Sequence, residues 1–200
     1  MKVYYGLNES DYKELFAGEF QAFFDNLMID EGGKVTGDQA RKINDSGGAT
    51  KFGISLRFLQ GLGIEAGDIN HDGVIDEQDI VCLTKDQARD LYFKYFFNPL
   101  YLQITNVQLA NRIFNFGVNA GKGEAVKLLQ DTLNQVMQTP VLKVDCIFGI
   151  GTLGAVNAFA NQGKLYDAYI INIDNYYKGL NKPNFLKDWL NRAARLLPGH

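Results

Sequence analysis

One glutamate occupies a position that suits proton transfer better than packing. Glu31 ends an apolar helical pattern and is followed directly by Gly32 and Gly33, so we expect a helix to end with Glu31 in its last turn. A carboxylate there faces the negative end of the helix dipole and a partly apolar wall, and both disfavour its ionised form. A carboxyl group that stays protonated near neutral pH can act as a general acid, for example toward a glycosidic oxygen. The plainer alternative is a solvated acid at a helix end.

A second acid and a threonine follow in a glycine-rich segment. Residues 45–48, Asp-Ser-Gly-Gly, predict a tight turn, and residues 34–54 predict a small irregular β-hairpin or three-stranded flap. A flap packed across the end of the Glu31 helix would carry Asp45 and Thr50 opposite Glu31. A carboxylate in that place can hold a water on the far side of a sugar ring from the acid, as hydrolysis requires.

The helix that positions Glu31 is predicted from apolar residues at helical spacing. They place Glu31 on the core-facing side. These residues are Phe20, Phe23, Phe24, Leu27 and Met28. Before them, residues 1–18 predict a short leading helix or a packed arm, with Asn8 and Ser10 as candidate caps.

The order of these motifs resembles a known family. Glu-Gly-Gly at residues 31–33, followed by Asp-x-Gly-Gly-x-Thr-x-x-Gly-Ile at residues 45–54, resembles the N-acetylmuramidases of glycoside hydrolase family 108. It is also similar to the Glu, Asp, Thr order of phage lysozymes. The resemblance implies that Glu31 is the catalytic acid and that Asp45 and Thr50 position or activate water.

The sequence departs from the family pattern in three places. The family usually has proline where Ser46 stands and an aromatic residue where Lys34 stands. The segment between Gly33 and Asp45 is also longer than is usual. This extra length leaves Asp38 as an alternative to Asp45 for the second carboxylate.

Residues 68–79 have the spacing of a calcium-binding loop. Gly73 stands at the sixth position and apolar Ile75 at the eighth, as such loops require. The expected Ca²⁺ ligands are the side chains of Asp68, Asn70, Asp72, Asp76 and Asp79 and the main-chain carbonyl of Val74. Aspartate at the twelfth position, where glutamate is usual, resembles dockerin loops and predicts modest affinity. The alternative is a solvated acidic loop.

Aromatic side chains after this loop are candidates for sugar contacts. Thr84 is expected to cap a helix that carries Tyr92 and Tyr95, with Phe97 just beyond. Rings near a cleft can stack on sugars, although so dense an aromatic run more often indicates a core.

Two asparagines are candidates for the same cleft. A buried helix is expected from Val107 to Gly117, and Asn115 and Asn119 lie at its predicted end. We expect them either to line the cleft or to satisfy hydrogen bonds at the helix end.

The last third of the chain predicts three or four amphipathic helices, at residues 124–137, 151–160, 164–180 and 183–197. The sequence VDCIFGIGTLGAV at residues 144–156 resembles the VDGxxGxxT turn of peptidoglycan-binding modules, a resemblance that spans about residues 117–180. Cys146 stands where those modules often have glycine.

Composition excludes several classes of protein. A chain of 200 residues with 46% hydrophobic content suits one large domain or two small ones. The net charge of -3, with no basic stripe, argues against nucleic acid as a partner. No window approaches the roughly 20 apolar residues of a membrane span, and the first residues do not resemble a signal peptide. Cys82 and Cys146 are isolated, which predicts free, partly buried thiols.

We therefore expect an α+β fold that is mainly α-helical and lysozyme-like, with a small β flap and a C-terminal helical lobe. Residues 1–116 would form the catalytic lobe with the calcium loop, and residues 117–200 a peptidoglycan-binding lobe. Calcium would be structural, and catalysis would need no cofactor.

The expected function is that of a monomeric N-acetylmuramidase. It would cleave the β-1,4 bond between N-acetylmuramic acid and N-acetylglucosamine in the glycan strands of peptidoglycan. Without a signal peptide, we expect synthesis in the cytoplasm and action at the cell wall after release by a holin or a secretion system. The alternative is a catalytically lapsed peptidoglycan-binding accessory of a secretion or phage system.

Overall fold

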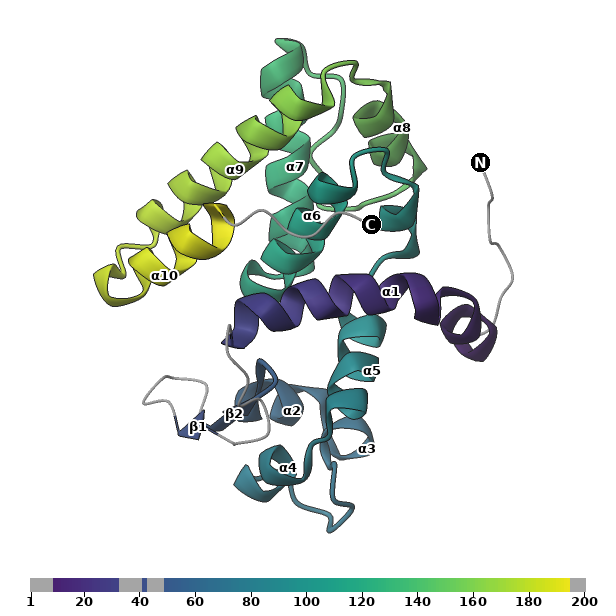
Figure 1. The fold of residues 1–200 in the computed structure, drawn as a ribbon, viewed down its shortest axis with the longest axis vertical. Coiled ribbons are helices and arrows are strands. Elements are labelled where there is room, and N and C mark those ends of the chain that lie inside the picture. Colours follow the sequence, from purple (N-terminus) through teal and green to yellow (C-terminus); the bar gives the residue numbers. More distant parts are fainter. Residues whose placement is uncertain (1–8, 33–40, 43–48, 195–200) are drawn as a thin grey trace. The chain divides into compact units, whose positions relative to one another are not determined.

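The computed structural model describes residues 9–32, 41–42 and 49–194, which belong to two compact units (Figure 1). The first unit comprises residues 1–26 and 95–200, and the second comprises residues 27–94. The described residues are mainly helical and include a small antiparallel sheet, as predicted.

Helix α1 (Glu9–Gly32) contributes residues to both units. The predicted apolar stripe is buried at Phe20, Phe23, Phe24 and Leu27. The helix ends one residue after Glu31, which confirms the prediction that Glu31 lies in its last turn. The short separate leading helix was wrong, because residues 9–18 continue into α1 without a break.

The second unit contains the predicted three-stranded flap. Its strands are β1 (Arg41–Lys42), β2 (Ala49–Lys51) and β3 (Ile54–Ser55), which pair antiparallel in the order β1-β2-β3. Thr50 in the central strand is opposite Arg41 on one side and Ser55 on the other.

Short helices complete this unit. They are α2 (Leu56–Leu62), α3 (Ile64–Gly67), α4 (Glu77–Cys82) and most of α5 (Lys85–Tyr95). Ser55 caps α2 by accepting a hydrogen bond from the Phe58 N–H at 3.2 Å, and Thr84 caps α5 by accepting from the Gln87 N–H at 3.2 Å. Both caps were predicted, whereas α4 was not.

The first unit contains the N-terminal part of α1 and several further helices. They are η1 (Pro99–Gln103), α6 (Val107–Ala120), α7 (Lys122–Met137), α8 (Ile150–Ala158), α9 (Gln162–Gly179) and α10 (Pro183–Ala194). The four predicted C-terminal helices are confirmed. The predicted end of α6 at Gly117 was wrong: Gly117 is buried inside the helix, where α7 passes close by, and α6 ends at Ala120 before Gly121 with φ +96°.

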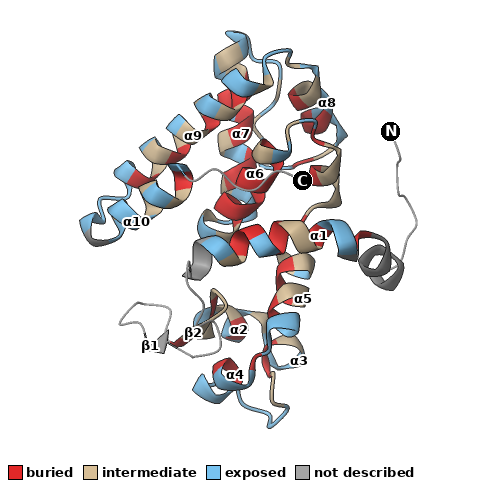
Figure 2. Cartoon of the chain, viewed as in Figure 1, coloured by how far each residue is buried: buried red, intermediate tan, exposed pale blue. Residues whose placement is uncertain are grey.

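An aromatic cluster holds α1, α6 and the segment just before η1 together in this unit. Phe97 lies 4.8 Å from Phe20 and 5.2 Å from Phe23 between ring centroids, and Phe114 lies within 6.0 Å of all three. Figure 2 shows the buried faces of α1 and α6 that contribute to this core. Close beside it, the Asn26 amide donates a buried hydrogen bond of 3.0 Å to Asn111, which links α1 to α6.

The domain division predicted from the sequence differs from these compact units. The predicted boundary between residues 116 and 117 falls within α6, and α6 packs on α7 and α9 as well as on η1. Residues 95–116 therefore belong to the same compact unit as the C-terminal helices. Whether residues 117–200 have a separate function stays a prediction.

Candidate functional site

The predicted catalytic residues fall only partly within the described structure. Glu31 is the next-to-last residue of α1, but its side chain lies outside the described residues, as do Asp45 and its alternative Asp38. Thr50 is described, half-buried at the centre of β2. Because Thr50 is paired with strands on both sides, its backbone is held at a defined place in the flap.

A strained two-residue turn follows Thr50 and Lys51. Phe52 and Gly53 connect β2 to β3 with φ values of +52° and +78°, the signs required by a type I′ hairpin turn. Positive φ at a bulky residue such as Phe52 is a costly conformation that its surroundings must stabilise. A two-residue loop with glycine in second place is a sequence signal for a hairpin, but this turn was not predicted from the sequence.

Two side chains of the second unit stabilise this turn. The hydroxyl of Tyr92 donates a hydrogen bond of 3.0 Å to the Phe52 carbonyl. The Lys51 ammonium donates to the Val81 carbonyl at 2.7 Å and lies 5.5 Å from the centroid of the Phe52 ring. Tyr92 therefore has a structural role at the flap, which the sequence did not indicate.

Burial favours a core role for two of the candidate sugar-binding rings. Tyr92 is 1% exposed and Phe97 is 6% exposed, with Phe97 inside the aromatic cluster described above. Little of either ring surface is accessible to a sugar. Tyr95 is half-buried.

The two candidate asparagines have different surroundings. Asn115 is 2% exposed, and its side-chain nitrogen has no hydrogen-bond partner within the described ranges. Asn119 is exposed and hydrogen-bonded to the Tyr177 side chain. A buried amide without a partner costs about 1–3 kcal/mol, so Asn115 keeps its place as a candidate for ligand contact.

The predicted calcium loop is closed by hydrogen bonds between its acids and its own backbone. One Asp68 carboxylate oxygen accepts from the Asp72 N–H at 3.2 Å, and the other accepts from the Gly73 N–H at 2.8 Å. Gly73 has φ +89°, which explains the glycine at the sixth position. This tight turn is the backbone shape that a calcium loop needs.

Asp79, at the twelfth position, closes the loop from its other end. Its carboxylate accepts from the N–H groups of Ile69 at 2.7 Å, Asn70 at 3.2 Å and Asp76 at 2.8 Å. Burial acts to raise the pKa of Asp79, but these backbone hydrogen bonds lower it, and the net pKa lies below its ordinary value. Within the described part of the chain, no three His, Cys, Asp or Glu side chains are grouped to hold a metal. Binding of Ca²⁺ would therefore require the loop carboxylates to move closer together.

The motif that resembles peptidoglycan-binding modules is organised by one buried amide. Gln130 on α7 is 1% exposed, and its nitrogen donates to Asp145 at 2.9 Å and Thr152 at 3.1 Å. Its oxygen accepts from the N–H groups of Asp145 and Cys146, both at 3.1 Å. Cys146 has φ +65°, which gives a physical reason for glycine at this position in similar turns. Cys146 is exposed, as is Cys82, so their predicted partial burial was wrong.

Comparison with known proteins tests the family resemblance that the motifs indicated. Residues 24–121 match the family described as Glycosyl hydrolase 108. This match includes Glu31, Asp45 and Thr50, confirms the resemblance drawn from the motifs, and supports a glycosidase at the level of the family. Peptidoglycan is a fitting substrate for such a glycosidase. The matched segment ends at residue 121, close to the boundary predicted from the sequence.

The solved structure of SagA from Brucella abortus is similar over nearly the whole chain. It is 24% identical, with a TM-score of 0.69, and the alignment covers 90% of this chain and 92% of SagA. This likeness confirms the predicted lysozyme-like α+β fold. No curated protein matches the sequence. Across the described helices, none has both the length and the hydrophobicity needed to cross a bilayer.

Proposed function

We propose that the protein is an N-acetylmuramidase that hydrolyses the β-1,4 bond between N-acetylmuramic acid and N-acetylglucosamine in peptidoglycan. The observation that carries this proposal is the Glycosyl hydrolase 108 match over residues 24–121, which contains the complete Glu31, Asp45 and Thr50 series. The position of Glu31 in the last turn of α1 supports it, because the negative, C-terminal end of the helix dipole favours a protonated carboxyl group.

In this proposal the three residues have distinct roles. Glu31 donates a proton to the leaving glycosidic oxygen. Asp45, four residues before β2, orients a water or stabilises positive charge at the anomeric carbon, helped by the Thr50 hydroxyl. The separation of the two carboxyl groups sets the outcome: about 5–5.5 Å gives retention and about 6.5–9.5 Å gives inversion. NMR of the first-formed anomer measures this outcome.

The experiment that tests the proposal measures the loss of turbidity of purified cell walls. Glu31→Gln keeps the shape of the side chain but cannot donate the proton, so activity should fall by ~10²-fold or more without loss of fold. Activity of the variant within a few-fold of wild type would remove Glu31 from this role. Asp45→Asn should be costly and Asp38→Asn nearly silent, and the reverse order would make Asp38 the second carboxylate.

The competing function is that of a wall-binding accessory without catalysis. The observation that favours it is the resemblance of residues 144–156 to the turn of peptidoglycan-binding modules, which suggests a module of that shape in the C-terminal part of the chain. Co-sedimentation with purified walls separates the two functions when it is combined with the turbidity assay. Wild-type protein that sediments with walls but does not lower their turbidity is an accessory, whereas a muramidase does both.

We also propose that residues 68–79 bind Ca²⁺ as a structural ion. The spacing of Asp68, Asn70, Asp72, Asp76 and Asp79, with the Val74 carbonyl, supports this, as does the tight turn at Gly73. The hydrogen bonds that Asp79 makes to the loop backbone compete with metal binding, so the affinity should be modest.

A further inference from the structure

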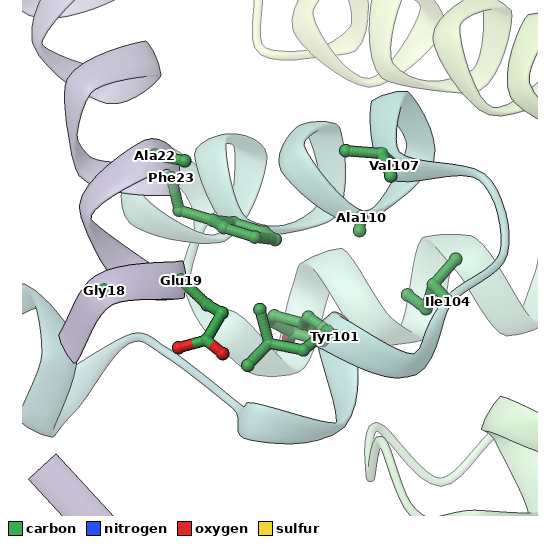
Figure 3. A pocket seen from close by; sticks show the side chains of 9 residues that line it. Gly18, Glu19, Ala22, Phe23, Tyr101, Ile104, Val107 and Ala110 are labelled. Carbon is green, nitrogen blue, oxygen red and sulfur yellow. The ribbon is translucent and has the colours of Figure 1, made fainter. Parts of the chain in front are cut away.

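The first compact unit contains an apolar pocket that the proposed chemistry does not use. It has a volume of about 590 Å³, within the range of small-molecule sites. Its walls come from α1, η1 and the start of α6, and Figure 3 shows their side chains around it. The lining residues are Gly18, Glu19, Ala22, Phe23, Tyr101, Leu102, Ile104, Val107 and Ala110.

The pocket exists because small residues stand where two helices face it. Gly18 and Ala22 are one turn apart on α1, and Ala110 is on α6. A Cβ atom added at Gly18 would meet nothing within 4 Å, so close packing does not explain this glycine. The space is therefore available to a ligand.

Only two side chains of the lining carry polar groups suited to holding a ligand, Glu19 and Tyr101. Glu19 is exposed at the edge of the apolar wall, and it makes no ion pair with any residue that the structure describes. A carboxylate without a cation, beside an apolar surface, is complementary to a ligand with a positive end and an apolar body.

Tyr101 supplies a second polar group. It is 2% exposed, and its ring is fixed by edge contacts with Phe97 at 6.1 Å and Phe148 at 4.9 Å. Within the described residues its hydroxyl makes no hydrogen bond, and burial raises its pKa. The hydroxyl therefore stays protonated and is able to donate to a ligand carbonyl at the pocket wall.

We propose that this pocket binds an aliphatic primary amine, the side chain of a diamino acid in the stem peptide of the cell wall. The methylene groups would lie on Phe23, Ile104 and Val107, and the ammonium would pair with Glu19. A neighbouring peptide carbonyl would accept from Tyr101. The choice of a stem peptide rests on the proposed function, whereas the preference for an amine rests on the pocket alone.

The test measures binding to full-length protein that carries Glu31→Gln, so that wall fragments are not consumed. Titrations followed by NMR compare n-hexylamine, n-hexanol and hexanoate. The amine should bind about fivefold more tightly than the alcohol, as expected for an ion pair at the edge of a surface, and hexanoate should bind most weakly. Equal affinity for the amine and the alcohol would overturn the proposal.

Matched variants identify the groups responsible. Glu19→Gln should abolish the preference for the amine, while Asp25→Asn, which removes another exposed carboxylate of α1, should leave it unchanged. Gly18→Leu should fill the pocket and prevent binding of all three probes, and it should fold because leucine favours a helix more than glycine does. An amine preference that survives Glu19→Gln would contradict the assignment.

A final arm tests the source of the amine. A stem peptide with a free lysine ε-amine should bind more tightly than the same peptide acetylated at that amine, and equal binding would overturn the assignment to the wall peptide. These measurements need no hydrolysis. A wild-type protein that fails to clear cell walls but keeps the amine preference would count against the muramidase and not against the pocket.

Discussion

Three tyrosines of similar burial allow the stabilising effect of the Tyr92 hydroxyl, which contacts the flap, to be measured against two controls. Tyr92, Tyr169 and Tyr101 are 1%, 0% and 2% exposed. Tyr92 and Tyr169 each donate a hydrogen bond of 3.0 Å to a main-chain carbonyl, whereas the Tyr101 hydroxyl has no partner among the described residues. Replacement by phenylalanine removes only the hydroxyl, so the three variants differ chiefly in the hydrogen bond lost.

The expected effects follow from these partners. Tyr92→Phe and Tyr169→Phe should each lower the free energy of unfolding by about 1 kcal/mol, the usual net value of a neutral hydrogen bond. For a chain of this length that is a fall in melting temperature of about 2–4 °C. Tyr101→Phe should be nearly neutral, because its hydroxyl makes no hydrogen bond to any described residue.

Thermal unfolding followed by circular dichroism measures all three variants under one condition. A Tyr92→Phe melting temperature within 1 °C of wild type would show that the bond to the Phe52 carbonyl does not stabilise the turn. A loss in Tyr101→Phe as large as that in Tyr92→Phe would show that hydroxyl burial alone, and not the hydrogen bond, sets the effect. Either result would refute the stabilising role of the Tyr92 hydroxyl at the flap.

Three further predictions test other parts of the chain. Cys146→Gly should raise the melting temperature by about 2–4 °C, because glycine relieves roughly 1 kcal/mol of left-handed strain, while Cys82→Gly in α4 should lower it. Hydrogen bonds from Gln130 and then from the Ile147 N–H lower the pKa of Asp145 in the folded protein. The ionised carboxylate therefore stabilises the fold above its ordinary pKa of 3.8, and this stabilisation is lost as the pH falls through the lowered pKa of the folded state. Asp145→Asn should flatten the pH dependence of unfolding below about pH 4, and an unchanged slope would contradict this. Added Ca²⁺ should stabilise wild type by roughly 2.7 kcal/mol at a hundredfold excess over Kd, and so raise its melting temperature. The melting temperature of Asp72→Ala should not change. Equal melting curves of wild type with calcium and with chelator would exclude the metal site.

The elements most successfully predicted from the sequence were those with strong local signals. Gly32 and Gly33 predicted the end of α1 after Glu31. Ser55 and Thr84 were predicted as caps because a hydroxyl at the start of a helix can accept from a backbone N–H of its first turn. The error at Gly117 has a different origin. Glycine is a helix-ending signal, but in this chain it lies inside α6 where α7 approaches, and only tertiary packing distinguishes the two uses.

The candidate site was harder to predict, because burial and partners depend on residues far apart in the chain. Tyr92 belongs to an aromatic run that equally suits a core or a sugar platform, and its role at the flap depends on Phe52, 40 residues earlier. The conformation of Phe52 was not predictable either, since phenylalanine rarely adopts positive φ. Only the Gly53 that follows it hinted at a tight hairpin turn.

The Gln130 interactions bear on how the C-terminal resemblance should be interpreted. Asp145 and Thr152 belong to the motif, yet both point their polar groups at a glutamine buried under them, and Cys146 occupies a turn position that favours glycine. A motif whose polar residues close a loop onto α7 is evidence for the shape of that loop, not for direct contact with a ligand. Any wall binding by residues 117–200 should therefore depend on exposed residues outside the motif. Gln130→Ala should reduce such binding only as far as it unfolds the turn, and a loss of wall binding with the melting temperature unchanged would instead place the motif at the contact.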